Sequence, residues 1–230
     1  MTVEIVKPLS WITYQVSLTG ITELLGGMPK TEDLIAGQMA SKEVRLRAKA
    51  TGRDPERIVA ANMVAMGLEA GVEEQMDEEK MSCGFRKHRG QLCLGSHQIP
   101  SLLLDCATTS RLSRTRPGLV DLLNRGTITS QHGCEDHGDA CPFLALGVSE
   151  PTGVLEWGHQ VKDRAGSRAV LRRYDYLHPW SLECFVKYLD NGVVTKQVWD
   201  NLWELAQIQG LGAARPRNYG KFSVKYDRVD

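Results

Sequence analysis

The chain has 230 residues, of which 42% are hydrophobic, and its 28 Lys and Arg balance 28 Asp and Glu to a formal net charge of zero. This length supports one sizeable core, and the charge balance excludes a uniformly basic nucleic-acid clamp. No apolar run is long enough to cross a membrane and no signal-peptide pattern is present, so we expect a cytoplasmic protein whose six cysteines do not form a disulfide scaffold.

The first predicted element is a half-buried strand over residues 11–19, where apolar and polar side chains alternate. Residues 31–50 favour a helix, and Asp54-Pro55-Glu56 predicts the start of a second helix that runs to about residue 70. We expect residues 30–80 to form an inserted subdomain. Four cations of the first helix could line a solvated face or belong to a mobile basic arm that contacts nucleic acid: Lys42, Arg45, Arg47 and Lys49.

Residues 85–94 predict a β-hairpin that turns at His88-Arg89-Gly90, and residues 102–107 predict a short apolar helix. A run of arginines interleaved with serine and threonine follows, at Arg111, Arg114 and Arg116. Guanidinium groups and hydroxyls both bind phosphate oxygens, so this run is interpreted either as an arm that contacts a nucleic-acid backbone or as a solvated basic loop.

Four soft metal ligands then fall close together, at His132, Cys134, His137 and Cys141. They could hold a structural zinc ion, with Cys83, His88 or Cys93 as a further ligand, although structural zinc sites use two ligand pairs separated by a longer connection. The alternative is a polar loop with incidental Cys and His. We expect this loop to belong to an insertion over about residues 108–165.

Strand patterns over residues 143–148 and 169–177 lead to the best-defined part of the sequence. Residues 180–188 alternate as a strand, Asp190-Asn191-Gly192 predicts a turn, residues 195–209 form an amphipathic helix, and residues 221–226 form a last strand.

The loop between this last helix and last strand is rich in glycine and positive charge. It holds Gly210, Gly212 and Gly220 as structural glycines and Arg215, Arg217 and Lys221 as cations. Glycine leaves backbone amides uncovered, so such a loop suits an anion, and in particular a polyanion. The alternative is a helix C-cap at Gly210 followed by an ordinary connection.

At this point the residues resemble a family. The order strand, helix, Gly-x-Gly-x-x-Arg-x-Arg-x-Tyr-Gly-Lys-Phe, strand, with Leu18-Thr19-Gly20-Ile21-Thr22-Glu23-Leu24-Leu25 near the start, resembles the RAMP superfamily. Its members include backbone, processing and capping subunits of CRISPR effector complexes, and the motif is most similar to that of small RAMP-like proteins carried by phages and mobile elements. The resemblance covers the two ends and residues 85–107, and the Cys/His loop has no counterpart in it.

The resemblance implies an α+β, ferredoxin-like (RRM-like) core with an antiparallel sheet and helical and loop insertions, in a single RAMP-like domain. It also implies binding of single-stranded RNA or DNA along a basic groove, by a homo-oligomer or within a multi-subunit ribonucleoprotein. The arginine run and the glycine-rich loop would then supply the phosphate contacts.

Some RAMP relatives cleave RNA with an aspartate in a loop after the first strand, and Asp33 follows the first strand in a comparable place. It has no companion carboxylate, so the sequence predicts a binding protein before an endoribonuclease. A protein-binding module that engages a CRISPR complex is a third interpretation.

Overall fold

The computed structural model describes residues 10–29, 49–52, 80–131, 141–163 and 166–229. The chain divides into two units, one made of residues 1–26, 85–153 and 176–230, the other of residues 27–84 and 154–175. Within the described residues, every helix is too short or too polar to cross a membrane.

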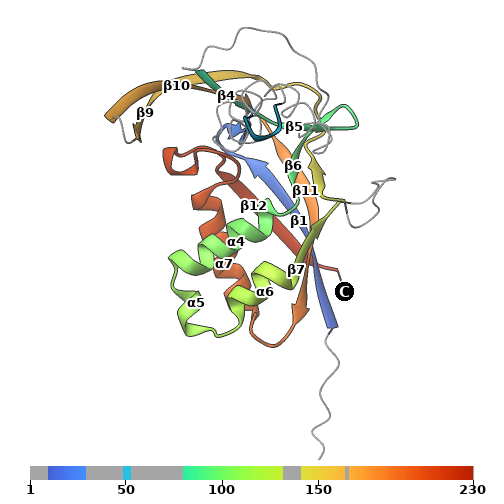
Figure 1. The fold of residues 1–230 in the computed structure, drawn as a ribbon. Helices are drawn as coiled ribbons and strands as arrows, with labels where there is room; N and C mark the ends of the chain where they lie inside the picture. The colour runs from blue at the N-terminus through green and yellow to red at the C-terminus, as the bar shows by residue number, and fades with distance from the viewer. Residues whose placement is uncertain (1–9, 30–48, 53–79, 132–140, 164–165, 230) are drawn as a thin grey trace, which may run out of the picture. The chain divides into compact units, whose positions relative to one another are not determined.

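The first unit is built on a four-stranded antiparallel sheet (Figure 1). Its strands in chain order are β1 (Ser10–Gly20), β7 (Thr127–Ser130), β11 (Ser181–Asp190) and β12 (Phe222–Arg228). Across the sheet the order is β12-β1-β11-β7, so the two longest strands lie at the centre.

Two helices connect these strands. Helix α4 (Gln98–Thr109) lies between β1 and β7 in the chain, and α7 (Lys196–Gln209) lies between β11 and β12. The chain order β-α-β-β-α-β with spatial order fourth, first, third, second is the ferredoxin-like topology, so the predicted fold class is confirmed. Two shorter helices, α5 (Leu112–Thr115) and α6 (Leu119–Arg125), lie between α4 and β7.

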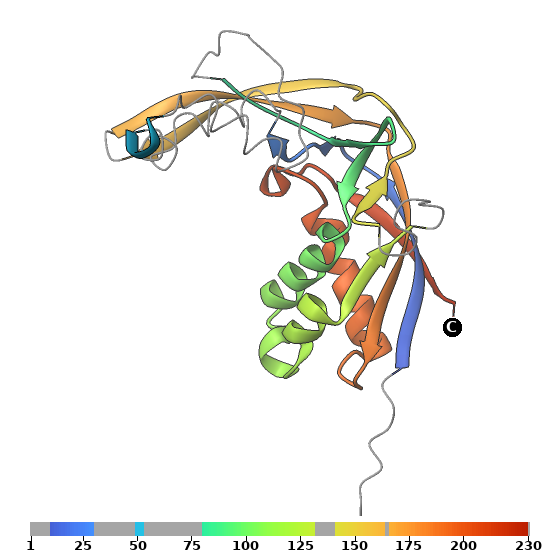
Figure 2. The same ribbon diagram turned by 45° about the vertical axis from the view of Figure 1, so that its right-hand side comes forward.

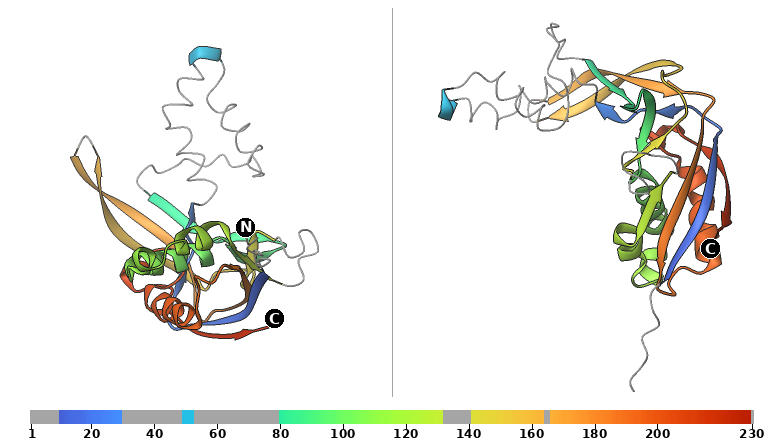
Figure 3. Two further views of the ribbon diagram at one scale, coloured as in Figure 1. Left: turned by 90° about the horizontal axis from the view of Figure 1, so that it is seen from below. Right: turned by 90° about the vertical axis from the view of Figure 1, so that its right-hand side faces the viewer.

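The helices cover one face of this sheet, as the edge-on view in Figure 3 shows. Strand β1 buries Ile12, Val16 and Leu18 on that face, while Gln15 and Thr19 on the alternate positions are exposed. Helix α7 contributes Trp199 and Trp203, both fully buried in the core. The period of two in the strand and the apolar stripe of the helix therefore meet in one core.

A second, three-stranded sheet in this unit contains β5 (Arg86–His88), β6 (Gln91–Gly95) and β8 (Phe143–Ala145). Arg89 and Gly90 both have positive φ, 52° and 75°, which is the geometry of a tight two-residue hairpin turn. The predicted hairpin is confirmed. Strand β2 (Leu24–Leu25) pairs with Tyr176 and Leu177 at the end of β10 (Gly166–Leu177).

The second unit is a sheet of β3 (Met28–Pro29), β4 (Lys80–Gly84), β9 (Gly153–Asp163) and the greater part of β10, and β9 pairs with β10 in a long ribbon, gold in Figure 2. Strand β4 runs parallel to β10, whereas β3 runs antiparallel to β4. Trp157 stacks on Tyr174 with ring centroids 4.6 Å apart, and Oε1 of Glu156 forms an ion pair with Nε of Arg173 (2.5 Å). Aromatic and charged pairs thus tie β9 to β10 side by side.

Several elements that the sequence predicts are present in the structure, and other elements were not predicted. The strands predicted over 11–19, 180–188 and 221–226 and the helix over 195–209 are present as β1, β11, β12 and α7. Helices α5 and α6 and strands β7 and β9 were not predicted, and they lie within the range expected to be an insertion. The helices predicted over 31–50 and 55–70 lie outside the described residues, apart from the last two positions of the first.

Candidate nucleic-acid interface

The glycine-rich loop leaves α7 through backbone that only glycine adopts easily. Gly210, Gly212 and Gly220 have φ of 82°, 80° and 69°. A β-carbon on Gly210 would lie 2.5 Å from the carbonyl oxygen of Tyr219, and one on Gly220 would lie 1.8 Å from that of Leu211. The three glycines are therefore structural, because conformation and close backbone approach both require them.

The loop packs against the segment that follows β1. The amide of Ala213 donates to the carbonyl of Leu25 (3.0 Å), and the amide of Gly220 donates to that of Glu23 (2.7 Å). In the other direction, the amide of Ile21 donates to the carbonyl of Lys221 (2.7 Å). Backbone hydrogen bonds thus join residues 21–25 with residues 213–221, about 200 positions away. The two segments quoted for the family resemblance therefore lie side by side.

Thr22 is the centre of this junction. Its hydroxyl accepts from the amide of Lys221 (2.9 Å) and donates to the carbonyl of Asn218 (3.0 Å). Its own carbonyl accepts from the indole Nε1 of Trp180 (2.8 Å). Sequence reasoning missed Thr22 and Trp180 as partners of the loop, although Thr22 stands inside the motif near the chain start.

These hydrogen bonds change how the loop can meet an anion. The amides of Gly210, Leu211, Ala213, Gly220 and Lys221 donate within the protein. An anion at this loop would therefore be bound by side chains, and the uncovered amides that glycine suggested in the sequence serve the fold instead.

Arg215 starts a single 3-10 turn, η2 (Arg215–Arg217), and reaches across to helix α4. Its Nη2 lies 2.8 Å from Oδ2 of Asp105, with the two side chains 34% and 50% exposed. Such a solvent-exposed ion pair stabilises by at most about 1 kcal/mol, so it orients Arg215 more than it holds the fold. Arg217 is exposed and Lys221 is half-buried.

The second arginine cluster is helical. Arg111 has a left-handed φ of 60° and precedes α5, in which the amide of Arg114 donates to the carbonyl of Arg111 (3.0 Å). The segment that the sequence left open as an arm or a solvated loop forms a short helix, and Leu112 packs against the hydrophobic core. All three arginines, including Arg116, remain exposed.

Helix α4 links the two clusters. Its Asp105 holds Arg215, its last residue Thr109 accepts from Nε2 of Gln209 (3.1 Å), and α5 follows directly after it. Residues 98–125 carry four arginines against two aspartates, and residues 210–221 carry two arginines, one lysine and no acid. In a chain of zero formal net charge, both of these segments therefore carry an excess of positive charge.

Most other predicted site residues lie outside the described residues: Asp33, Lys42, Arg45, Arg47, His132, Cys134 and His137. Lys49 is described and exposed in a helical turn of the second unit. Among the described residues no group of three or more His, Cys, Asp or Glu is placed to hold a metal ion.

Cys141 is the one described member of the predicted zinc set, and it is buried. Burial raises the pKa of nearby Cys93 to about 11; Arg86 lowers it and Cys141 raises it further. A thiol with this pKa is protonated at neutral pH and would have to lose its proton to solvent before its sulfur could bind a metal. Zinc binding stays a prediction, which metal analysis of purified protein decides.

Comparison with known proteins gives a likeness in fold alone. No known protein family and no curated protein matches the sequence. Among solved structures, a chain of the type III-B Cmr-beta complex bound to cognate target RNA matches with 10% identity and a TM-score of 0.48 over 96% of this chain. This chain spans 61% of the length of that one.

A chain of a type IV-B CRISPR complex matches with 9% identity and a TM-score of 0.40, covering 94% of this chain and 90% of the other. Likeness at these values does not indicate what this chain binds.

Proposed function

We propose that this protein is a RAMP-like, single-strand nucleic-acid-binding subunit that holds RNA or DNA by its phosphate backbone. The observation that carries the proposal is the excess of cations in the two segments that meet at α4, with three exposed arginines at α5, exposed Arg217 at η2 and half-buried Arg215 beside it. Phosphate contacts supply most of the affinity of single-strand binders that do not read sequence.

The glycine-rich loop supports the proposal through its geometry. Most of its amides donate within the protein, and Arg215 is held at α4 by one carboxylate oxygen. A guanidinium group has five N–H donors, so this single contact leaves donors for phosphate oxygens. We therefore propose that the glycine-rich loop holds its cationic side chains in fixed positions for phosphate binding. This loop belongs to the segment that resembles RAMP proteins.

The test is binding of fluorescent single-stranded RNA and DNA across a salt series. Each phosphate contact to a single strand contributes about 0.7 to the slope of log affinity against log salt. The triple variant Arg111→Ala/Arg114→Ala/Arg116→Ala should lower the slope by roughly 2, and Arg215→Ala/Arg217→Ala by roughly 1.4.

A charge-matched control is Lys87→Ala/Lys196→Ala, which removes two cations paired with Glu150 and Asp200. It should leave the slope unchanged. Equal slopes in all variants would overturn the assignment of the surface. Strand cleavage that disappears in Asp33→Ala would assign the protein to the RAMP-type endoribonucleases instead, and absence of nucleic-acid binding would favour a protein-binding module.

A further inference from the structure

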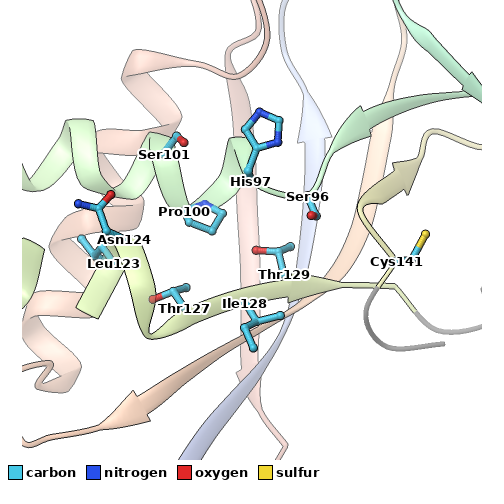
Figure 4. Close-up of a pocket in the computed structure, with 10 residues that line it drawn as sticks. All are labelled: Ser96, His97, Pro100, Ser101, Leu123, Asn124, Thr127, Ile128, Thr129 and Cys141. Atoms are coloured by element: carbon cyan, nitrogen blue, oxygen red, sulfur yellow. The ribbon is translucent and has the colours of Figure 1, made fainter. Parts of the chain in front are cut away.

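A cavity of about 260 Å³ lies in the first unit, away from the arginine clusters. It is formed where α4 begins, α6 ends and β7 runs past them (Figure 4). Its lining mixes polar side chains with apolar Pro100, Leu123 and Ile128, and among the described residues it contains no carboxylate: Ser96, His97, Pro100, Ser101, Leu123, Asn124, Thr127, Ile128, Thr129 and Cys141.

Thr129 is the unusual member of this lining. It is only 4% exposed, and its hydroxyl has no hydrogen-bond partner. Figure 4 shows the side chain directed from β7 toward the start of α4, on the side opposite Ile128. The hydroxyl of neighbouring Thr127 differs, because it donates to the carbonyl of Leu122 at 3.0 Å. A buried hydroxyl without a partner costs free energy, so one aimed into a cavity points to an absent ligand.

The start of α4 supplies the second contribution. This helix has 12 residues, its N-cap His97 makes no side-chain capping bond, and its first turn contains no acidic residue. The first amides of a helix and its dipole together favour a negative charge. In α4 the dipole and the amides before Pro100 supply this effect, because Pro100 has no N–H and the amide of Ser101 donates to the carbonyl of His97 (3.0 Å). Ser96, Ser101 and Asn124 add hydroxyl and amide donors around this helix start.

We infer that this cavity binds the phosphate monoester of a nucleotide. The donors are those that bind phosphate oxygens, and the part of the lining that the structure describes holds no carboxylate that would repel a phosphate. The cavity of about 260 Å³ exceeds what one oxyanion needs and leaves room for the attached sugar against Pro100 and Leu123. The nucleotide is either free or the phosphorylated end of a strand, and the site goes beyond the proposed backbone-binding surface, from which none of its lining residues comes.

The test is calorimetric titration of the full chain with 5′-AMP, adenosine and inorganic phosphate. AMP should bind at least tenfold more tightly than adenosine, because the phosphate makes the main contacts. Thr129→Val, which keeps the shape and removes the hydroxyl, should weaken AMP at least tenfold without lowering the melting temperature of the free protein.

Thr108→Val is the matched control, since its hydroxyl on α4 donates to the carbonyl of Leu104 (2.9 Å) and Thr108 does not line the cavity. It should change AMP affinity less than threefold. If Thr129→Val fails to fold, Ser101→Ala at the exposed first turn of α4 replaces it and should also weaken AMP.

Binding of a tetranucleotide with a 5′-phosphate distinguishes a free nucleotide from the phosphorylated end of a strand as the ligand. Tighter binding than AMP, lost when the phosphate is absent, identifies a strand end, whereas equal or weaker binding than AMP identifies a free nucleotide. The inference is overturned if AMP does not bind, if adenosine binds as tightly as AMP, or if neither Thr129→Val nor Ser101→Ala reduces AMP affinity. All these ligands are too short to test the arginine surface, so its failure and the failure of this site are distinguishable.

Discussion

At the scale of single residues, Gly220 is subject to two separate constraints. Its φ of 69° is left-handed, and its α-carbon lies against the backbone of Leu211. Gly90 in the β5–β6 turn shares the first constraint, with φ of 75°, but has open space where a β-carbon would point. The two glycines thus separate the cost of conformation from the cost of contact.

Gly220→Ala should therefore destabilise far more than Gly90→Ala. The left-handed conformation alone costs an alanine about 1–2 kcal/mol, and the clash should bring the loss for Gly220→Ala above roughly 4 kcal/mol. Denaturant unfolding of both variants measures the difference. Similar losses would mean that the loop can open without cost to the core.

At the scale of elements, α7 and β12 are joined by a polar pair above an aromatic cluster. The hydroxyl of Tyr226 donates to Oδ1 of Asp200 (2.6 Å), and Nζ of Lys196 donates to Oδ2 (2.9 Å). Tyr226 also stacks on Trp203, with ring centroids 6.2 Å apart. The last strand is thus held to the last helix by side chains as well as by the loop.

This pair gives a pH prediction. The hydrogen bonds from Tyr226 and then Lys196 hold the pKa of Asp200 below its ordinary value of 3.8. Its contribution to stability is complete above the unfolded-state pKa and is lost as pH falls through the lower folded-state pKa. Unfolding measured between about pH 6 and about pH 3 should therefore show a smaller acid loss in Asp200→Asn and in Tyr226→Phe than in the natural protein. An acid loss equal to that of the natural protein in both variants would contradict the assignment.

Elements with a clear period were predictable from sequence, and those without one were not. Strand β1 and helix α7 alternate or repeat over ten or more residues. Strand β7 has four residues and turns Thr127 and Thr129 toward the buried side, so its pattern is polar where a strand should be apolar. The pairing of Arg215 with Asp105, 110 positions away, has no sequence signal at all.

At the scale of the whole molecule, the proposed function implies several copies on one strand. Single-strand binders of this kind cover on the order of ten nucleotides each. Mass measurement of complexes with strands of about 10, 20 and 40 nucleotides should show the number of copies rising with strand length. One copy on every length would limit the protein to a single-subunit role and leave the phosphate contacts unaffected.

The pairing of β1 with β12 also governs how the first unit reaches its folded state. Tyr14 pairs with Arg228, and the amide of Val229 donates to the carbonyl of Thr13 at 3.0 Å. Contacts between residues so distant in sequence close late and slow folding, because chain entropy is lost before they form. On the ribosome, β1 would wait at an unpaired sheet edge until β12 has been synthesised, so a delay in translation exposes that edge to other chains.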